Sequence, residues 1–218
     1  RDMLSAPRDP EYNPDLTGNI VAQGNEAHIR ALIKFEKWEQ ILTPGTIAWN
    51  AGDDFGKFGQ AFTEALAYNG LGKTKEAKER LADLKSLVKK LNPDAKNLED
   101  PTLPTTFFIQ VAEGLVSLGE GKFLEGQRAL LNAADIEQKQ RDKYQFQNDP
   151  PSQPWPVMRL LGDHYRGQSD FKLAIECYER ALKNEPNDGF ALSGLALSHF
   201  DSGNKERAEH FSGRLAYV

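Results

Sequence analysis

A regular spacing of apolar and small residues, beginning near Trp155, constrains the fold of this chain more than any other feature of its sequence. Met158, Leu161 and Tyr165 recur at three- and four-residue intervals, so they share one face of a predicted helix, and Gly162 on that face lets a second backbone approach closely. After a turn at 167–170, a second apolar stripe comprises Phe171, Ala174, Ile175, Tyr178, Ala181 and Leu182. A helix hairpin of this kind cannot bury both apolar faces alone, so it requires stacked neighbours.

This spacing resembles the tetratricopeptide repeat, whose pattern W-x2-L-G-x2-Y, then A-x3-F, then P, extends over about 34 residues. Met158 stands where the family has Trp, Tyr178 where it has Phe, and Pro186 where it has Pro. A shift of 34 positions lands on Leu192, Leu195, Ala196, His199 and Ala208, so a second copy follows directly. Ser212 falls where the family has an aromatic residue. The resemblance implies a right-handed superhelix of antiparallel helix hairpins.

Looser copies of the hairpin lie upstream, and no window alternates with period two, so the sequence predicts an all-α fold of about ten helices. The predicted hairpins span about residues 19–48, 57–91, 106–140, 155–188 and 189–218. Residues 1–18, which contain three prolines and few apolar residues, are predicted to form an extended linker.

Composition narrows the classes of partner. Lys and Arg number 27 against 32 Asp and Glu, so the net charge is −5, and no basic surplus favours a nucleic-acid partner. No run approaches the ~20 consecutive apolar residues of a membrane span, so no membrane insertion is expected. Cys177 is the one cysteine of the chain, which excludes an internal disulfide and a cysteine-based zinc site.

The compartment and the oligomeric state stay open. The sequence begins at Arg1 rather than methionine and ends at Val218 within a predicted helix, so we expect a fragment of a longer protein, either cytoplasmic or exported, for example to a bacterial periplasm. The run from Ile33-Lys-Phe35-Glu-Lys-Trp38 through Pro154-Trp-Pro156, which covers most of the chain, is similar to a group of bacterial repeat proteins of undefined role, and this similarity implies a bacterial, non-enzymatic protein.

One segment resembles a nucleotide-binding motif. Residues 67–74, Ala-Tyr-Asn-Gly-Leu-Gly-Lys-Thr, approximate the phosphate loop G-x-x-x-x-G-K-[ST] with alanine for the first glycine. That loop follows a buried strand, whereas residues 58–68 carry a helical stripe. We therefore interpret Gly70-Leu-Gly72 as a hairpin turn and predict no cofactor.

The reactive side chains form no catalytic or metal-binding motif. His199 and His210 lie on the two helices of the last hairpin without a third ligand, and His199 is interpreted as a packing residue. Cys177 is interpreted as a small core residue, and the acidic pair Asp53-Asp54 as a helix cap. The sequence therefore predicts no enzyme, no metal and no catalytic residue.

Two further segments have both a binding and a structural interpretation. Pro150-Pro-Ser-Gln-Pro154 suits an SH3-like domain, and it also stiffens the connection into the best-matching repeat. Residues 73–90 alternate in charge, which favours a solvated helix face over a nucleic-acid patch.

The resemblance also implies a concave groove that is lined by the first helix of each hairpin and holds a peptide, a helix or a partner loop. By register, the groove residues are Phe62, Leu66, Asn69, Phe108, Val111, Leu115, Arg159, Asp163, Arg166, Phe190, Ser193, Leu197 and Phe200. The Lys and Asn clamp with which one subgroup grips the C-terminal carboxylate of chaperones is not found at matching places, so that function is not carried over.

Arg159, Asp163 and Arg166 lie on one side of a predicted helix, which permits two interpretations. They form either a solvated intrahelical ion pair or a polar anchor for an acidic and apolar peptide beside Phe190, Leu197 and Phe200. If they form the anchor, replacing both arginines by alanine is expected to abolish partner capture with little change in melting temperature.

The leading function is a scaffold or interaction module that binds a protein or peptide partner. The alternatives are an accessory segment of a larger enzyme or transporter complex, and a solenoid that holds a small ligand within its groove.

Overall fold

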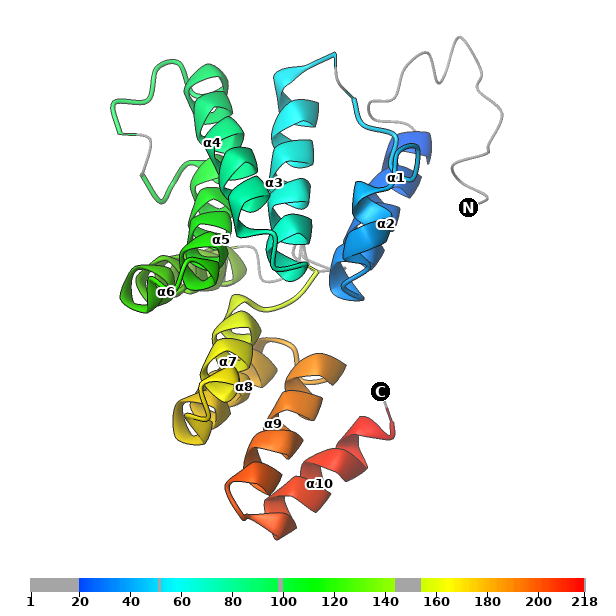
Figure 1. The fold of residues 1–218 in the computed structure, drawn as a ribbon, viewed down its shortest axis with the longest axis vertical. Coiled ribbons are helices and arrows are strands. Elements are labelled where there is room, and N and C mark those ends of the chain that lie inside the picture. The colour runs from blue at the N-terminus through cyan, green and yellow to red at the C-terminus, as the bar shows by residue number, and fades with distance from the viewer. Residues whose placement is uncertain (1–19, 51, 98–99, 144–153, 218) are drawn as a thin grey trace. The chain divides into compact units, whose positions relative to one another are not determined.

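The computed structural model describes residues 20–50, 52–97, 100–143 and 154–217, and within these ranges every regular element is an α-helix (Figure 1). Ten helices and no strand are found there, which confirms the predicted all-α class. The predicted linker at 1–18 and most of the proline-rich segment before Trp155 lie outside the described residues. Among the described helices, none is both long enough and apolar enough to cross a membrane. The helices group into two compact units, Arg1–Glu120 and Gly121–Val218, which are described separately.

The first unit contains the helices α1 (Ile20–Lys34), α2 (Trp38–Leu42), α3 (Asp54–Gly70), α4 (Thr74–Leu91) and α5 (Pro104–Gly119). The helices α3 and α4 form its main hairpin, and α5 packs against both of them. Small residues make this close packing possible, because Ala65, Ala67 and Ala77 are almost completely buried at the contacts. Asp53 caps α3 by accepting a hydrogen bond from the Gly56 backbone N–H at 2.8 Å, which confirms the capping interpretation.

The segment that resembles a phosphate loop joins two helices. It covers the end of α3, the turn at Leu71–Lys73 and the start of α4. Gly72 adopts φ +69°, a left-handed conformation that glycine reaches without strain. Because a helix rather than a strand precedes the turn, the hairpin interpretation is confirmed.

Two lysines on the charged face of α4 form ion pairs with glutamates of α5 and its C-cap. Lys78 Nζ lies 2.7 Å from Glu120 Oε1, and Lys85 Nζ lies 2.7 Å from Glu113 Oε1. Both lysines remain about half exposed, so each pair contributes less than about 1 kcal/mol. The alternating charges of residues 73–90 therefore form a solvated face with two links to the neighbouring helix.

The second unit contains the helices α6 (Phe123–Lys143), α7 (Val157–Gly167), α8 (Phe171–Asn184), α9 (Gly189–Asp201) and α10 (Lys205–Leu215). The helices α7 and α8 form one hairpin, α9 and α10 form the next, and α9 packs against both α7 and α8. The side chains of Asp170, Asp188 and Asn204 cap α8, α9 and α10 by accepting backbone hydrogen bonds. These caps set the start of each helix and hence the register of its faces.

Candidate functional site

Tyr178 of α8 is the residue against which the middle of α9 packs. A Cβ placed on Gly162 of α7 would lie 2.6 Å from the Tyr178 ring atom Cε1, and a Cβ on Gly194 of α9 would lie 2.6 Å from Tyr178 Oη. Neither position has room for a side chain, so the ring packs directly against the backbone of both α7 and α9. The Tyr178 hydroxyl donates a hydrogen bond to Asp163 Oδ1 at 2.7 Å, and burial raises the pKa of Tyr178. This arrangement explains the predicted close approach at Gly162.

Arg159 is in the interior of this contact. Its side chain is only 3% exposed, its Nε lies 3.3 Å from Asp163 Oδ2, and its guanidinium carbon lies 5.1 Å from the centre of the Phe190 ring. The predicted pairing with Asp163 is present, but the predicted solvent exposure is wrong, because α9 covers the arginine. Phe190 of α9 packs on Arg159. The guanidinium of Arg159 is therefore already used in a contact within the chain and is not presented to a partner.

Arg166 interacts with a different helix. Its Nη2 lies 3.3 Å from Asp201 Oδ2 at the end of α9, and both side chains are 36% exposed. The two arginines therefore do not share Asp163 as a single anchor. Each instead fixes one end of α9 on the α7–α8 hairpin.

This placement changes the expected behaviour of the arginine variants. Arg159→Ala removes a buried side chain, its ion pair with the half-exposed Asp163 and a cation–π contact, so we expect it to lower the free energy of unfolding by roughly 1–2 kcal/mol. Chemical denaturation measures this loss, and Arg180→Ala at an exposed position on α8 is the matched control. If Arg159→Ala and Arg180→Ala were equally stable, the assigned interior role of Arg159 would be wrong.

The predicted groove residues of the first unit are distributed between core and surface. Phe62, Leu66 and Val111 are buried, with at most 7% of each residue exposed, so they are core residues and present no side chain to a partner. Their apolar character serves the contact between α3 and α5. Asn69, Phe108 and Leu115 are half-buried.

Phe108 belongs to an aromatic cluster in the first unit. Its ring lies edge-on to those of Phe58 and Phe62, with centroid distances of 5.8 and 5.0 Å. Asn69 lies against Gly119, where its Oδ1 would be 2.8 Å from an added Cβ. Phe108 and Asn69 are therefore also engaged in packing between helices.

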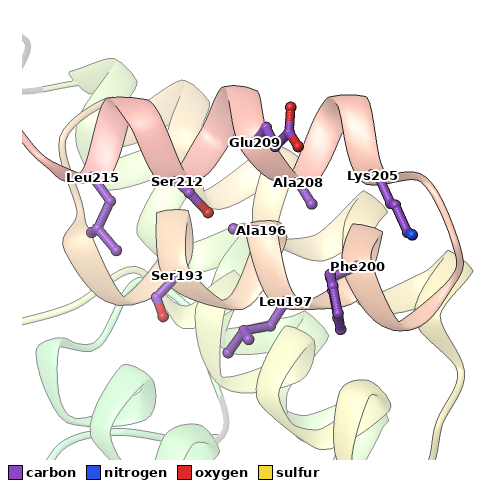
Figure 2. Close-up of a pocket in the computed structure, with 9 residues that line it drawn as sticks. All are labelled: Ser193, Ala196, Leu197, Phe200, Lys205, Ala208, Glu209, Ser212 and Leu215. Carbon is purple, nitrogen blue, oxygen red and sulfur yellow. The ribbon is translucent and has the colours of Figure 1, made fainter.

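The second unit, in contrast, presents an open pocket on the α9–α10 hairpin. Its volume is about 620 Å³, and Figure 2 shows side chains of both helices around it. It is lined by Ser193, Ala196, Leu197, Phe200, Lys205, Ala208, Glu209, Ser212 and Leu215. Leu197 is 43% and Phe200 61% exposed, and these two large apolar side chains lie together at the pocket. Three of the predicted groove residues, Ser193, Leu197 and Phe200, are thus brought together here.

The α10 side of this pocket was not predicted from the sequence. The groove prediction used only the first helix of each hairpin, whereas five lining residues come from the second helix. One residue of the sequence could have indicated this pocket: Ser212 stands where the repeat pattern has an aromatic residue. A small residue at that position leaves empty the volume that Tyr178 fills in the preceding hairpin.

A buried charged cluster joins α6 to the start of α7. The Val157 backbone N–H donates to Glu137 Oε2 at 3.2 Å, and Arg141 Nη2 lies 3.7 Å from Glu137 Oε1 and 2.7 Å from Glu185 Oε1. Burial raises the pKa of Glu137 to about 7, against the opposing effects of Arg141 and the Val157 hydrogen bond, and Glu185 raises it further. The cluster lies inside a helix contact and has a structural role.

The other reactive side chains are also packed into the fold. His199 stacks on Phe211 with parallel rings 5.7 Å apart, and burial lowers its pKa, so the interpretation of His199 as a packing residue is confirmed. Cys177 is buried, and burial raises the pKa of its thiol to about 11, which keeps it protonated at neutral pH. Within the described part of the chain, no three His, Cys, Asp or Glu residues are grouped so as to hold a metal ion.

Comparison with known proteins identifies one repeat. The tetratricopeptide repeat family model matches residues 155–188, the segment that forms α7 and α8. No curated protein and no solved structure matches the chain. The matched segment contains Gly162 and Tyr178, whose contact seats the next helix. The helices α7 and α8 therefore form a tetratricopeptide repeat within this all-α chain.

Proposed function

We propose that this chain is a protein-interaction module that binds a polypeptide partner at the α9–α10 pocket. The observation that carries the proposal is the exposure of Leu197 and Phe200 beside that pocket. Burying such side chains against a partner releases about 25 cal/mol for each Å² of apolar surface removed from water. Tetratricopeptide repeats characteristically act through extended binding surfaces of this kind, which supports the same assignment.

The character of the pocket favours a polypeptide over a small molecule. Small-molecule sites are enclosed and combine an apolar lining with a few converging polar groups. Here the pocket is open to solvent along two helices, and its polar groups are Lys205, Glu209 and two serines. The net charge of −5 argues against nucleic acid as the partner. The lining offers no nucleophile paired with a base, which supports a non-enzymatic role.

Affinity capture with exposed-residue variants tests this function. The chain carrying Leu197→Ser and Phe200→Ser is compared with the unchanged chain as bait, and captured polypeptides are quantified by mass spectrometry. The matched control is Phe55→Ser, which alters a 71% exposed aromatic residue in the first unit. We expect at least one polypeptide to be retained by the unchanged and Phe55→Ser chains and depleted about tenfold by the pocket variant.

The three altered side chains are all exposed, so the variants are expected to keep the melting temperature of the unchanged chain. Equal capture by all three baits would contradict binding at this pocket.

A further inference from the structure

Two carboxylates lie within reach of one arginine where α6 meets the α7–α8 hairpin. Arg141 Nη2 lies 2.7 Å from Glu185 Oε1, at the C-terminal end of α8, and 3.7 Å from Glu137 Oε1, four residues earlier on α6. Only the first of these distances is that of a hydrogen bond. Arg141 therefore joins α6 to the end of α8, and Glu137 lies beside it as a second possible partner.

The pair that is not formed would use two buried atoms. Within the described residues, Glu137 Oε1 and Arg141 Nε are buried and have no hydrogen-bond partner, whereas Glu137 Oε2 accepts the Val157 backbone N–H. A guanidinium can donate two parallel hydrogen bonds to one carboxylate, and a glutamate four residues before a basic residue is the favourable order for a pair on one helix. A second arrangement is therefore available to Arg141, in which it turns from Glu185 to Glu137.

The charge on Glu137 decides which arrangement is favoured. The Glu137 side chain is 5% exposed against 15% for Glu185, so its charged form is the more costly to leave without a counter-charge. Burial raises the pKa of Glu137 to about 7, so this carboxyl changes between a neutral and a charged group near neutral pH. A neutral Glu137 leaves the guanidinium with Glu185, whereas a charged Glu137 attracts it more strongly than the more exposed Glu185 does.

The charged groups that act on Glu137 come from α6 and from the end of α8. Arg141 lowers its pKa and Glu185 raises it, while the start of α7 contributes the Val157 backbone N–H, which also lowers it. The balance at Arg141 is thus set by the two carboxylates. The ionisable side chains of α7 make their contacts elsewhere, and they are Arg159, Asp163, His164, Tyr165 and Arg166.

We propose that Arg141 forms a pH-sensitive switch, in which it pairs with Glu185 while Glu137 is protonated and with Glu137 after that carboxyl loses its proton. On deprotonation, Glu137 releases its proton to water and takes the guanidinium, and water then solvates the Glu185 carboxylate. The ionic link between α6 and the end of α8 is lost, and the hydrogen bond that Asn184 Nδ2 donates to Gln138 Oε1 at 3.2 Å remains as a neutral link. The attachment of α6 to the tetratricopeptide repeat is therefore tighter at acidic pH.

A double-mutant cycle for Arg141 and Glu185 measures the ionic link at two pH values. Arg141→Gln, Glu185→Gln and the double variant are compared with the unchanged chain by urea denaturation at pH 5.5 and pH 8.5. We expect the coupling between the two residues to fall about twofold or more at the higher pH, because Arg141 has then turned to Glu137. In chains that also carry Glu137→Gln, which does not titrate, we expect equal coupling at both pH values.

The neutral link supplies the matched control. A second cycle, with Asn184→Ala and Gln138→Ala, is expected to give a coupling that does not change between the two pH values, because neither side chain titrates. Carboxyl ¹³C NMR of the unchanged chain adds a readout that requires no unfolding. We expect the Glu185 signal to shift with the same midpoint as the Glu137 signal.

An Arg141–Glu185 coupling that stays constant from pH 5.5 to pH 8.5 would overturn the switch, as would an equal fall in the Glu137→Gln background. A parallel fall in the Asn184–Gln138 coupling would also overturn it, because α6 would then separate from α8 as a whole without a change of partner at the arginine. If the Arg141 variants failed to fold, a Glu185 signal that did not follow Glu137 would still exclude the proposed exchange.

Discussion

Replacing Gly162 by leucine is expected to lower the free energy of unfolding by about 1–3 kcal/mol, because the new side chain has no space beside Tyr178. Even the Cβ atom would lie 2.6 Å from the Tyr178 ring, closer than carbon atoms approach in folded proteins. Gly194 of α9 also lies against this ring, so a shift of the ring disturbs the packing of α9. Either the ring or α9 must be displaced, and α9 is the helix that carries Leu197 and Phe200.

Urea denaturation followed by circular dichroism measures this loss. Gly213→Leu is the matched control, since Gly213 lies on an exposed part of α10 with nothing within 4 Å of its Cβ position. We expect that control to leave stability unchanged or to raise it, because leucine favours the helix over glycine. If Gly162→Leu were as stable as the unchanged chain, the α7–α8 register and the seating of α9 would both be wrong.

The second large effect concerns the pH dependence of stability at Glu137. In the folded chain the pKa of Glu137 is about 7, above the ordinary glutamate value of 4.5, because burial disfavours the charged form. Between these two values the folded state holds a proton that the unfolded state has released. The resulting stabilisation is fully present below pH 4.5 and is lost as the pH rises through 7.

Glu137→Gln isolates this effect, because the amide keeps the size of the side chain and an oxygen that accepts the Val157 N–H bond, and it does not titrate. We expect the stability of the unchanged chain, measured relative to Glu137→Gln, to fall by about 2.5 kcal/mol between pH 5 and pH 8. Denaturant unfolding at half-unit pH intervals measures the difference. The same change at the exposed Glu125 of α6 is the control for the amide itself.

A difference between the unchanged and Glu137→Gln chains that stays constant from pH 5 to pH 8 would contradict the raised pKa. A difference that grows in favour of glutamate at high pH would mean that Arg141 dominates over burial. Neither result would bear on the α9–α10 pocket, since Glu137 belongs to the contact between α6 and α7.

Much of the local structure follows from short-range pattern. The stripe Met158, Leu161 and Tyr165 predicts α7, and the capping and turn residues set its neighbours, because helix formation depends on spacing within a few residues. Gly162 was recognised as a point of close approach for the same reason. The phosphate-loop alternative was also resolved correctly from sequence, because the helical stripe before Gly70 left no strand for the loop to follow.

The position of each residue within the repeat pattern did not predict correctly which residues are exposed for binding. It grouped Arg159 with Leu197 and Phe200, although the structure buries Arg159 and exposes the other two. A residue on the first helix of a hairpin is covered or left open according to what stacks on it, and the sequence of that helix does not carry this information. The same reasoning placed Phe62, Leu66 and Val111 on a surface, where the contact between α3 and α5 makes them core.

The sequence alone thus determined the helices, the turns and the repeat pattern of this protein, because these depend on residues close together in the chain. Only the tertiary structure decided which faces are closed. The ring of Tyr178 is sealed by a glycine 16 residues later, whereas the hollow beside Ser212 stays open in the described part of the chain. The reason is that a side chain is buried only when a second helix packs on it, so the sequence of one helix does not determine whether its face is buried.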